Sequence, residues 1–386
     1  MVGRRLSWRA SRLRTMRRAI HARPDGRTLT LYAFDRPLPA VRQFDHAPGR
    51  PAGRPGELEL RWNALLGEWV IISTARQERT FLPPDEYCPL CPTTPSSPFA
   101  TEIPAPDFEI AVFDNRFPSL RPDAPAVASG GPFERRARAA GTSEVVVYTP
   151  DHAASLRTLP QRHVRRLVDV WTDRFERLCS LDETEYVFVF ENRGREIGVT
   201  LTHPHGQIYA FPYVPPRIQT EQAAMRAHGA ECLLCEAIDG ELAGGARVVA
   251  EAPGWLAYVP FAARVPYEVH MAPTEHRSSL LALSDAERGG LAAILRDVQA
   301  RYDGLWGFDM PYTMSMHQRP VRAADSDRDH LHVEFMPPYR SRDKLKYLAG
   351  VETGAGTFIN DTSPEEKAGE LRAVDVALAD HADERP

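Results

Sequence analysis

Two histidines, a glycine and a glutamine stand together in the segment His203-Pro204-His205-Gly206-Gln207. Alternate residues of an extended strand share one face, so the side chains of His203, His205 and Gln207 can point the same way. An imidazole can attack phosphorus and pass the bound group on, and a neutral amide can donate to a phosphate oxygen without repelling it. A metal ligand, a nucleophile and an amide side by side predict chemistry on a phosphorus ester.

Four of the five cysteines form two Cys-x-x-Cys pairs, and two separated histidines follow each pair. Two cysteines at this spacing and two distant histidines make a tetrahedral Cys2His2 set. The first set is Cys88, Cys91, His152 and His203, and the second is Cys232, Cys235, His276 and His330. Four protein ligands leave no open position, so we expect structural zinc in both sets. The fifth cysteine, Cys179, lies in a helix-like stretch and receives no role.

The two histidines of the first segment then have different tasks. If His203 binds metal, His205 is free to act as the nucleophile, and Gly206 allows close approach of backbone or substrate. The second half of the chain carries His332 where the first carries His205, but Glu334 stands at the position of Gln207. A carboxylate there would repel a phosphate, so we do not expect His332 to be a second nucleophile.

The elements that must position these residues also occur twice. Each half reads Cys-x-x-Cys, strands, x-x-His, one helix, a strand and His-x-His, which indicates an internal duplication. The helical periodicity covers residues 160–182 in the first half and 285–302 in the second. Prolines at 212, 215 and 216 mark a boundary, which predicts an N-terminal domain over residues 26–216 and a C-terminal domain over 217–386.

Composition narrows the class of protein. The length of 386 residues favours two domains, and a net charge of −5 does not fit a nucleic-acid binder. No apolar run is long enough for a membrane span, so we expect a cytoplasmic protein without membrane or nucleic-acid partners. Residues 1–25 are basic, and we interpret them as a disordered extension or as the product of an upstream start codon. The basic character comes from Arg4, Arg5, Arg9, Arg12, Arg14, Arg17 and Arg18.

Three further segments are candidate ligand contacts. Arg76 and Arg79 are spaced to lie on one side of a turn and could bind phosphates, although solvated surface arginines explain the spacing equally well. The segments 115–118 and 192–194 are turn-like and rich in amide donors, and they would be plain turns in isolation.

From about Arg61 to Arg372 the chain resembles the galactose-1-phosphate uridylyltransferase family of the histidine-triad superfamily. The motifs that carry the resemblance are Arg61-Trp-Asn, Glu68-Trp, Cys88-Pro-Leu-Cys91, Asn115-Arg-Phe-Pro-Ser, Pro150-Asp-His152, Phe190-Glu-Asn-Arg-Gly194, His203-Pro-His-Gly-Gln-Ile208, His330-Leu-His332, the stretch 344–352 and Phe358-Ile-Asn-Asp361. The resemblance implies an α+β fold of two tandem histidine-triad-like domains, each a curved antiparallel sheet with covering helices.

The resemblance also implies a ping-pong reaction. His205 would attack the α-phosphorus of UDP-glucose, and galactose 1-phosphate would then take up the UMP group, while Gln207 binds the transferred phosphoryl group. The implied substrate contacts within the chain are Arg76, Arg79, Asn115, Arg116, Asn192, Gly198, Val199 and Thr200. Across a homodimer with shared active sites, Lys346, Tyr347, Val351 and Glu352 would reach the nucleotide-sugar of the partner.

The chain departs from the family at one metal site. Members with a second, iron-binding site use one Glu and three His; Glu221, His317 and His332 match, but Glu334 replaces the last His. Because the second Cys2His2 set is complete, we favour zinc at the second site and keep iron as the alternative. An ADP-sugar or dinucleotide phosphorylase that uses an adenylyl-histidine is the alternative function. A zinc-stabilised binding protein without turnover is disfavoured by the acidic net charge and the intact His205 and Gln207 pair.

Overall fold

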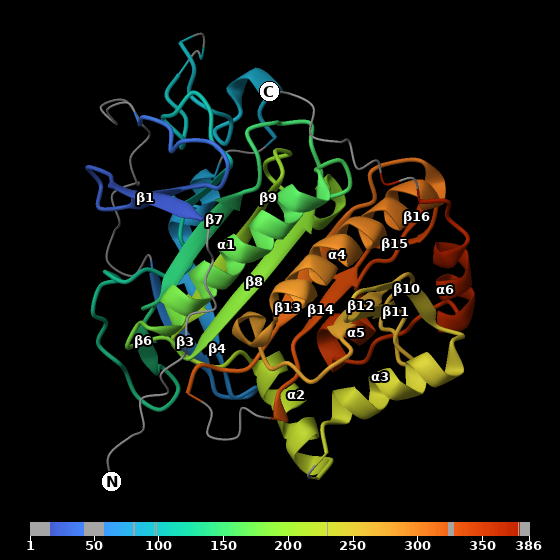
Figure 1. Ribbon diagram of the computed structural model, residues 1–386. Coiled ribbons are helices and arrows are strands. Elements are labelled where there is room, and N and C mark those ends of the chain that lie inside the picture. Colours follow the sequence, from blue (N-terminus) through green and yellow to red (C-terminus); the bar gives the residue numbers. More distant parts are fainter. Residues whose placement is uncertain are drawn as a thin grey trace.

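An antiparallel sheet of eleven strands forms the frame of the protein (Figure 1). The computed structural model describes residues 16–41, 58–79, 82–95, 97, 99–229, 231–322, 328–376 and 378. In this part of the chain the strand order is β1-β2-β5-β7-β9-β8-β13-β14-β12-β11-β10. The strands are β1 (Arg17–Ala22), β2 (Thr28–Ala33), β5 (Ile110–Asp114), β7 (Thr142–Val147), β8 (Tyr186–Arg193), β9 (His205–Phe211), β10 (Val248–Ala252), β11 (Trp255–Tyr258), β12 (Val269–Pro273), β13 (Tyr312–His317) and β14 (His332–Met336).

The strand order confirms the internal duplication. The run β5-β7-β9-β8 in the first half mirrors β11-β12-β14-β13 in the second, and the two runs meet where β8 pairs with β13. Phe190 and Ser315 are partners across this seam. The two expected sheets are therefore joined edge to edge into one continuous sheet, because β8 and β13 are the edge strands of the two halves and pair with each other.

Helices α1 (Gln161–Cys179) and α4 (Asp285–Trp306) lie side by side on one face of the sheet (Figure 1). They occupy equivalent places in the two halves, and both were predicted. Trp171 of α1 and Leu295 of α4 are fully buried in one hydrophobic core together with Ile208 and Ala210 of β9. Because strand side chains alternate, His205 and Gln207, which are an odd number of residues from Ile208 and Ala210, must face away from the helices.

Smaller elements complete the fold. A second sheet has the order β4-β3-β6, and β3 and β4 form an antiparallel hairpin. The remaining elements are β3 (Leu58–Asn63), β4 (Glu68–Ser73), β6 (Arg136–Arg138), β15 (Tyr339–Ser341), β16 (Lys344–Leu345), α2 (Pro216–Ala227), α3 (Leu233–Gly244), α5 (Gly350–Ala355) and α6 (Pro364–Arg372). None of the helices in the described ranges combines the length and apolarity needed to cross a bilayer.

The N-terminal segment differs from the prediction. Residues Arg17–Ala22 form the edge strand β1, which pairs with β2 through partners such as Ile20 and Thr30. The expected disorder of residues 1–25 is therefore wrong from Arg17 onward. Arginines on an edge strand are compatible with pairing because their side chains can stay in solvent, and the basic composition hid the strand. The arginines from Arg4 to Arg14 lie outside the described residues.

Candidate active site and metal centres

The His-x-His segment enters the sheet at its second histidine. Strand β9 begins at His205, whereas His203 precedes it in a bend and is buried, with 1% of its surface exposed. Proline at 204 has no N–H to donate to a strand ladder, so pairing starts after it. The expectation of a shared face holds for His205 and Gln207, which line one cavity, and is wrong for His203.

His205 has the hydrogen bonding of a nucleophile. Its Nδ1 lies 2.7 Å from the carbonyl oxygen of His203. A carbonyl can only accept, so Nδ1 carries the proton and Nε2 keeps its lone pair. Burial lowers the pKa of His205, against the opposing effect of that hydrogen bond. The imidazole is therefore neutral near pH 7, which is the form that can attack an electrophile.

A buried network fixes strand β9 beside His205. A Cβ on Gly206 would lie 2.3 Å from the hydroxyl oxygen of Tyr148, so no other residue fits against this tyrosine. Tyr148 and Tyr312 each donate to one carboxylate oxygen of Glu191, at 2.9 Å in both cases. Gln299 of α4 donates to Tyr312 at 2.7 Å. The second half of the chain thus helps to hold His205 of the first.

Gln207 is oriented by its neighbours. The Tyr209 hydroxyl lies 3.5 Å from Oε1 of Gln207, and Arg76 lies 3.4 Å from the same hydroxyl. With Oε1 accepting from Tyr209, the amide N–H groups of Gln207 are directed to other acceptors. Arg79 lines the same cavity, and burial together with the charge of Arg76 lowers its pKa. This end of the cavity offers donors to an anionic oxygen.

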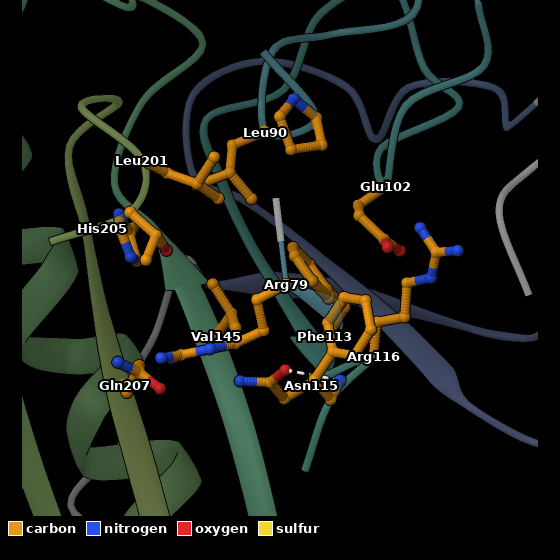
Figure 2. A pocket seen from close by; sticks show the side chains of 13 residues that line it. Arg79, Leu90, Glu102, Phe113, Asn115, Arg116, Val145, Leu201, His205 and Gln207 are labelled. Carbon is orange, nitrogen blue, oxygen red and sulfur yellow. Dashed lines mark hydrogen bonds between the residues drawn. The ribbon is translucent and has the colours of Figure 1, made fainter. Parts of the chain in front are cut away.

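The cavity beside His205 and Gln207 has a volume of about 650 Å³ including its opening to solvent. Figure 2 shows its polar end at His205, Gln207 and Arg79, and its opposite end at Glu102 and Arg116. The side chains of Leu90, Phe113, Phe117, Val145 and Leu201 line the space between. An aromatic and aliphatic slot that ends in donors for phosphate suits a nucleotide.

A second cavity, of about 1470 Å³ including its open mouth, lies on the other side of His205. Asn192 and Val199 line it, together with Arg157, Arg193 and Arg195. His205 therefore lies between an apolar slot and a wider polar cavity. A residue that passes a chemical group from one molecule to another needs access to both molecules.

The structure distributes the predicted substrate contacts over several places. Arg79, Asn115, Arg116 and Thr200 line the first cavity, and Asn192 and Val199 line the second. Arg76 lines neither and acts through Tyr209. Gly198, Lys346, Tyr347, Val351 and Glu352 line neither.

The first Cys2His2 set is assembled as predicted. The ligand atoms of Cys88, Cys91, His152 and His203 lie within 4.8 Å of one another. Sγ of Cys91 is 3.4 Å from Nδ1 of both histidines. Tetrahedral zinc, with Zn–S of about 2.3 Å and Zn–N of about 2.0 Å, would separate S and N by about 3.5 Å, so the geometry fits. His203 donates its other N–H to the Thr149 carbonyl at 2.8 Å, the usual support of a metal-bound imidazole.

The second Cys2His2 set repeats this arrangement. The ligand atoms of Cys232, Cys235, His276 and His330 again lie within 4.8 Å of one another. Cys235 is 3.4 Å from Nδ1 of His330 and 3.6 Å from Nδ1 of His276. His330 donates its other N–H to the Pro273 carbonyl at 3.0 Å. Burial and the neighbouring Cys232 raise the pKa of Cys235, and a bound cation would favour the thiolate form of both cysteines.

A third cluster occupies the second-half position that corresponds to the active site. The ligand atoms of Glu221, His317, His332 and Glu334 lie within 4.8 Å of one another. Arg217 lies between the two carboxylates, 2.9 Å from Glu221 and 2.6 Å from Glu334. The donor set suits a divalent cation such as iron, while Arg217 already supplies one positive charge.

Several site residues were not predicted from the sequence. Tyr209 could have been found, because it lies two residues after Gln207 on the same strand face. Leu90 stands inside the Cys-Pro-Leu-Cys motif, which carries it into the cavity with the metal ligands. Glu102 and Arg217 had no sequence signal, because their roles depend on segments that are distant in the chain.

The fold is a duplicated α+β unit, and the second histidine of a His-x-His segment begins an inner strand in each half. Sequence profiles of the galactose-1-phosphate uridyl transferase N-terminal and C-terminal domains match residues 55–215 and 218–385. The chain therefore belongs to the galactose-1-phosphate uridyl transferase family.

Individual relatives agree with this assignment. The chain is 45% identical to a galactose-1-phosphate uridylyltransferase of Thermotoga maritima, over 83% of this chain and all of the relative. A solved uridylyltransferase structure has 33% identity and a TM-score of 0.72, covering 82% of this chain and 98% of the other. An ADP-glucose phosphorylase from Arabidopsis thaliana has 25% identity and a TM-score of 0.63, covering 82% and 99%.

Proposed function

We propose that the protein is a UDP-glucose—hexose-1-phosphate uridylyltransferase that works through a uridylyl-histidine at His205. The observation that carries the proposal is the pair of His205, with Nε2 unprotonated, and Gln207, with its amide directed by Tyr209, at one end of a cavity lined by apolar side chains. The curated relative from Thermotoga maritima and the matching family profiles support the uridylyl and galactose parts of the assignment.

The reaction then has two balanced steps. Nε2 of His205 forms a bond to the α-phosphorus of UDP-glucose, and the bond to the bridging oxygen breaks, which releases glucose 1-phosphate. A phosphate oxygen of galactose 1-phosphate next attacks the same phosphorus, the N–P bond breaks and UDP-galactose leaves. Amide donation from Gln207 and the charge of Arg79 stabilise the negative oxygens of the transferred group in both steps.

The two cavities assign the parts of the substrate. The uridine would occupy the slot lined by Phe113 and Val145, and the sugar phosphates would enter the wider cavity beside Asn192 and Arg195. We also propose a homodimer in which residues 346–352 complete the partner's site. Tyr347 is 74% exposed and Val351 44%, while a 3.1 Å ion pair between Lys346 and Glu352 supports their loop.

We propose zinc at both Cys2His2 sets, with a structural role. The first ion would hold the loop of Cys88 and Cys91, which carries Leu90 into the cavity, and also His203, which accepts the hydrogen bond of His205. Iron is the alternative metal, and the cluster of Glu221, His317, His332 and Glu334 has the donors for it. A cytoplasmic location remains part of the proposal.

An ADP-sugar phosphorylase is the second candidate, because the solved ADP-glucose phosphorylase shares the fold over nearly its whole length. Incubation of the metal-replete protein with donors labelled in the α-phosphate separates the two functions. We expect an acid-labile protein adduct from UDP-glucose, discharged by galactose 1-phosphate. An adduct from ADP-glucose alone, discharged by inorganic phosphate, would support the phosphorylase instead.

A further inference from the structure

A buried carboxylate stands at the end of the first cavity that lies away from His205. Glu102 lines the cavity and is 5% exposed. Its Oε2 accepts from Arg23 and, at 2.9 Å, from Arg27. Arg23 also donates to the Glu102 backbone carbonyl, so two guanidinium groups fix the position of this side chain. Pairing with two cations favours the carboxylate form, which accepts hydrogen bonds and donates none.

The second carboxylate oxygen is available to a ligand. Within the described part of the chain, no protein group donates to Oε1 of Glu102. Figure 2 shows the carboxylate pointing toward Arg116, which lines the same end of the cavity. Buried acceptors are normally satisfied, so an acceptor left open at a cavity wall marks a place for a donor on the ligand.

The position of Glu102 along the cavity says which part of the ligand it meets. His205 and Gln207 lie at the phosphate end, the apolar side chains of Leu90, Phe113 and Val145 lie between, and Glu102 follows (Figure 2). A nucleotide that places its phosphorus at His205 and its base in the apolar slot directs the outer edge of the base to Glu102.

We propose that Glu102 selects the base of the donor by accepting the ring N3–H of uracil. This inference rests on the proposed uridylyl transfer and names the group that chooses the nucleotide. Uracil presents a ring N–H between two carbonyl oxygens, whereas the same ring position of cytosine carries a lone pair that a carboxylate repels. A site built to accept a particular N–H rejects analogues that lack it, because the buried acceptor is then left unpaired.

The N-terminal hairpin and the first metal loop both position Glu102. Arg23 and Arg27 flank the turn between β1 and β2, and Arg23 also stacks 5.4 Å from the ring centre of Phe113. The backbone N–H of Glu102 donates to the Pro89 carbonyl, between the two cysteines of the first set, at 2.9 Å. The end of the cavity at Glu102 is therefore formed by the hairpin at the sheet edge and by the loop that carries the first metal ligands.

The test compares donors and one isosteric variant. In Glu102→Gln, the arginines retain the amide oxygen, so the amide N–H groups turn toward the cavity and a donor replaces the acceptor. Against UDP-glucose, we expect wild-type kcat/KM to fall roughly 10- to 100-fold with N3-methyl-UDP-glucose and with CDP-glucose. In Glu102→Gln, kcat/KM for UDP-glucose falls by a similar factor and the preference shifts toward CDP-glucose.

Asp107→Asn is the matched control. Asp107 is on the same loop, and its carboxylate is half exposed and paired with Arg36 at 2.7 Å outside the cavity, so the variant keeps the wild-type order of donors. Equal use of UDP-glucose and its N3-methyl derivative by the wild type would overturn the proposal without any variant. An unchanged ratio of UDP-glucose to CDP-glucose in folded Glu102→Gln would also overturn it, and both results leave uridylyl transfer standing. Use of ADP-glucose in place of UDP-glucose by the wild type would overturn the proposed function itself.

Discussion

The two halves of the molecule place different chemistry on the same frame. Gln207 pairs with Val145 across β7 and with Phe190 across β8. In the second half, Glu334 occupies the corresponding strand position and pairs with His270 across β12 and Ser315 across β13. The strand partners of Gln207 in the first half are neutral, whereas a titratable histidine is a strand partner of Glu334 in the second. The two halves share the same strand register, but the side chains at the equivalent positions differ in charge.

The two sites also differ in access. In the first half the face beside His205 opens into two cavities. In the second half, α2 lays Glu221 and Arg217 against the equivalent face, where Glu221 meets His317 at 3.0 Å. His332, with 7% of its surface exposed, is enclosed between them.

The difference in charge extends to the pKa values. Burial, then the nearby His317, lowers the pKa of His332 to about 4. Burial alone would raise the pKa of Glu221, but the hydrogen bond and charge of His317, with Arg217, hold it at about 2. The second half therefore holds an internally compensated cluster of charges, whereas the strand partners of Gln207 are neutral and the face beside His205 is open.

The largest expected effect comes from removing each histidine in turn. His205→Ala should abolish transfer, with a loss on the order of 10⁵-fold or more in kcat, because the covalent intermediate cannot form. His332→Ala should keep turnover. Steady-state rates with UDP-glucose and galactose 1-phosphate measure both, and comparable losses in the two variants would remove the asymmetry on which the comparison depends.

Replacing Gln207 of the first half with a glutamate, the residue at the equivalent position 334 of the second half, should have the next largest effect. Gln207→Glu replaces a donor with a group that repels the transferred phosphate, so we expect kcat to fall by about 10²- to 10³-fold. Gln219→Glu makes the same change of charge on an exposed position of α2 and should be silent. A fully active Gln207→Glu enzyme would show that the amide is not needed.

The two Cys2His2 sites have the same ligand types, but we expect only the first to affect activity strongly. We expect Cys88→Ser and Cys232→Ser each to lose about one zinc ion per chain, and Cys179→Ser to lose none. Cys88→Ser should lower kcat/KM for UDP-glucose by about 10²-fold, because the loop that holds Leu90 and Glu102 shifts, whereas Cys232→Ser should lower stability more than activity. Elemental analysis measures the zinc content of each variant, and steady-state kinetics with UDP-glucose measure its kcat/KM. Equal losses of kcat/KM in Cys88→Ser and Cys232→Ser would contradict the expected difference between the two sites.

The smallest effect is expected at the compensated cluster. Arg217→Met leaves Glu334, which is 3% exposed, without its 2.6 Å partner, so unfolding free energy should fall by about 1–3 kcal/mol with kcat unchanged. Arg340→Met removes an exposed pair with Asp361 and should change stability by less than about 0.5 kcal/mol. Urea unfolding compares them. A large loss of kcat in Arg217→Met would mean that the cluster takes part in the reaction.

Patterns that repeat in the chain were predictable. The spacing of Cys88, Cys91, His152 and His203 and its second copy gave both metal sets, and the strand-helix order gave the mirrored halves. The bend at His203 was not foreseen, because strand alternation ignores what Pro204 does to pairing.

Contacts between distant segments were not predictable. Arg23 lies in a stretch whose basic composition indicated disorder, yet it binds Glu102, 79 residues away. Arg217 reaches Glu334 across 117 residues. No sequence spacing predicts the pair of Arg23 and Glu102 or the pair of Arg217 and Glu334, because only the folded sheet brings the partners together. These pairs set the charge at the far end of the cavity that His205 lines in the first half and beside His332 in the second.

The most direct test of the account is to locate the covalent intermediate. The protein is mixed with UDP-glucose without an acceptor, quenched in base and digested, and the peptides with His205 and His332 are analysed by mass spectrometry. We predict a uridylyl group on His205 and none on His332. A uridylyl group on His332, or on a residue other than His205, would contradict the assignment of one working site and one compensated twin.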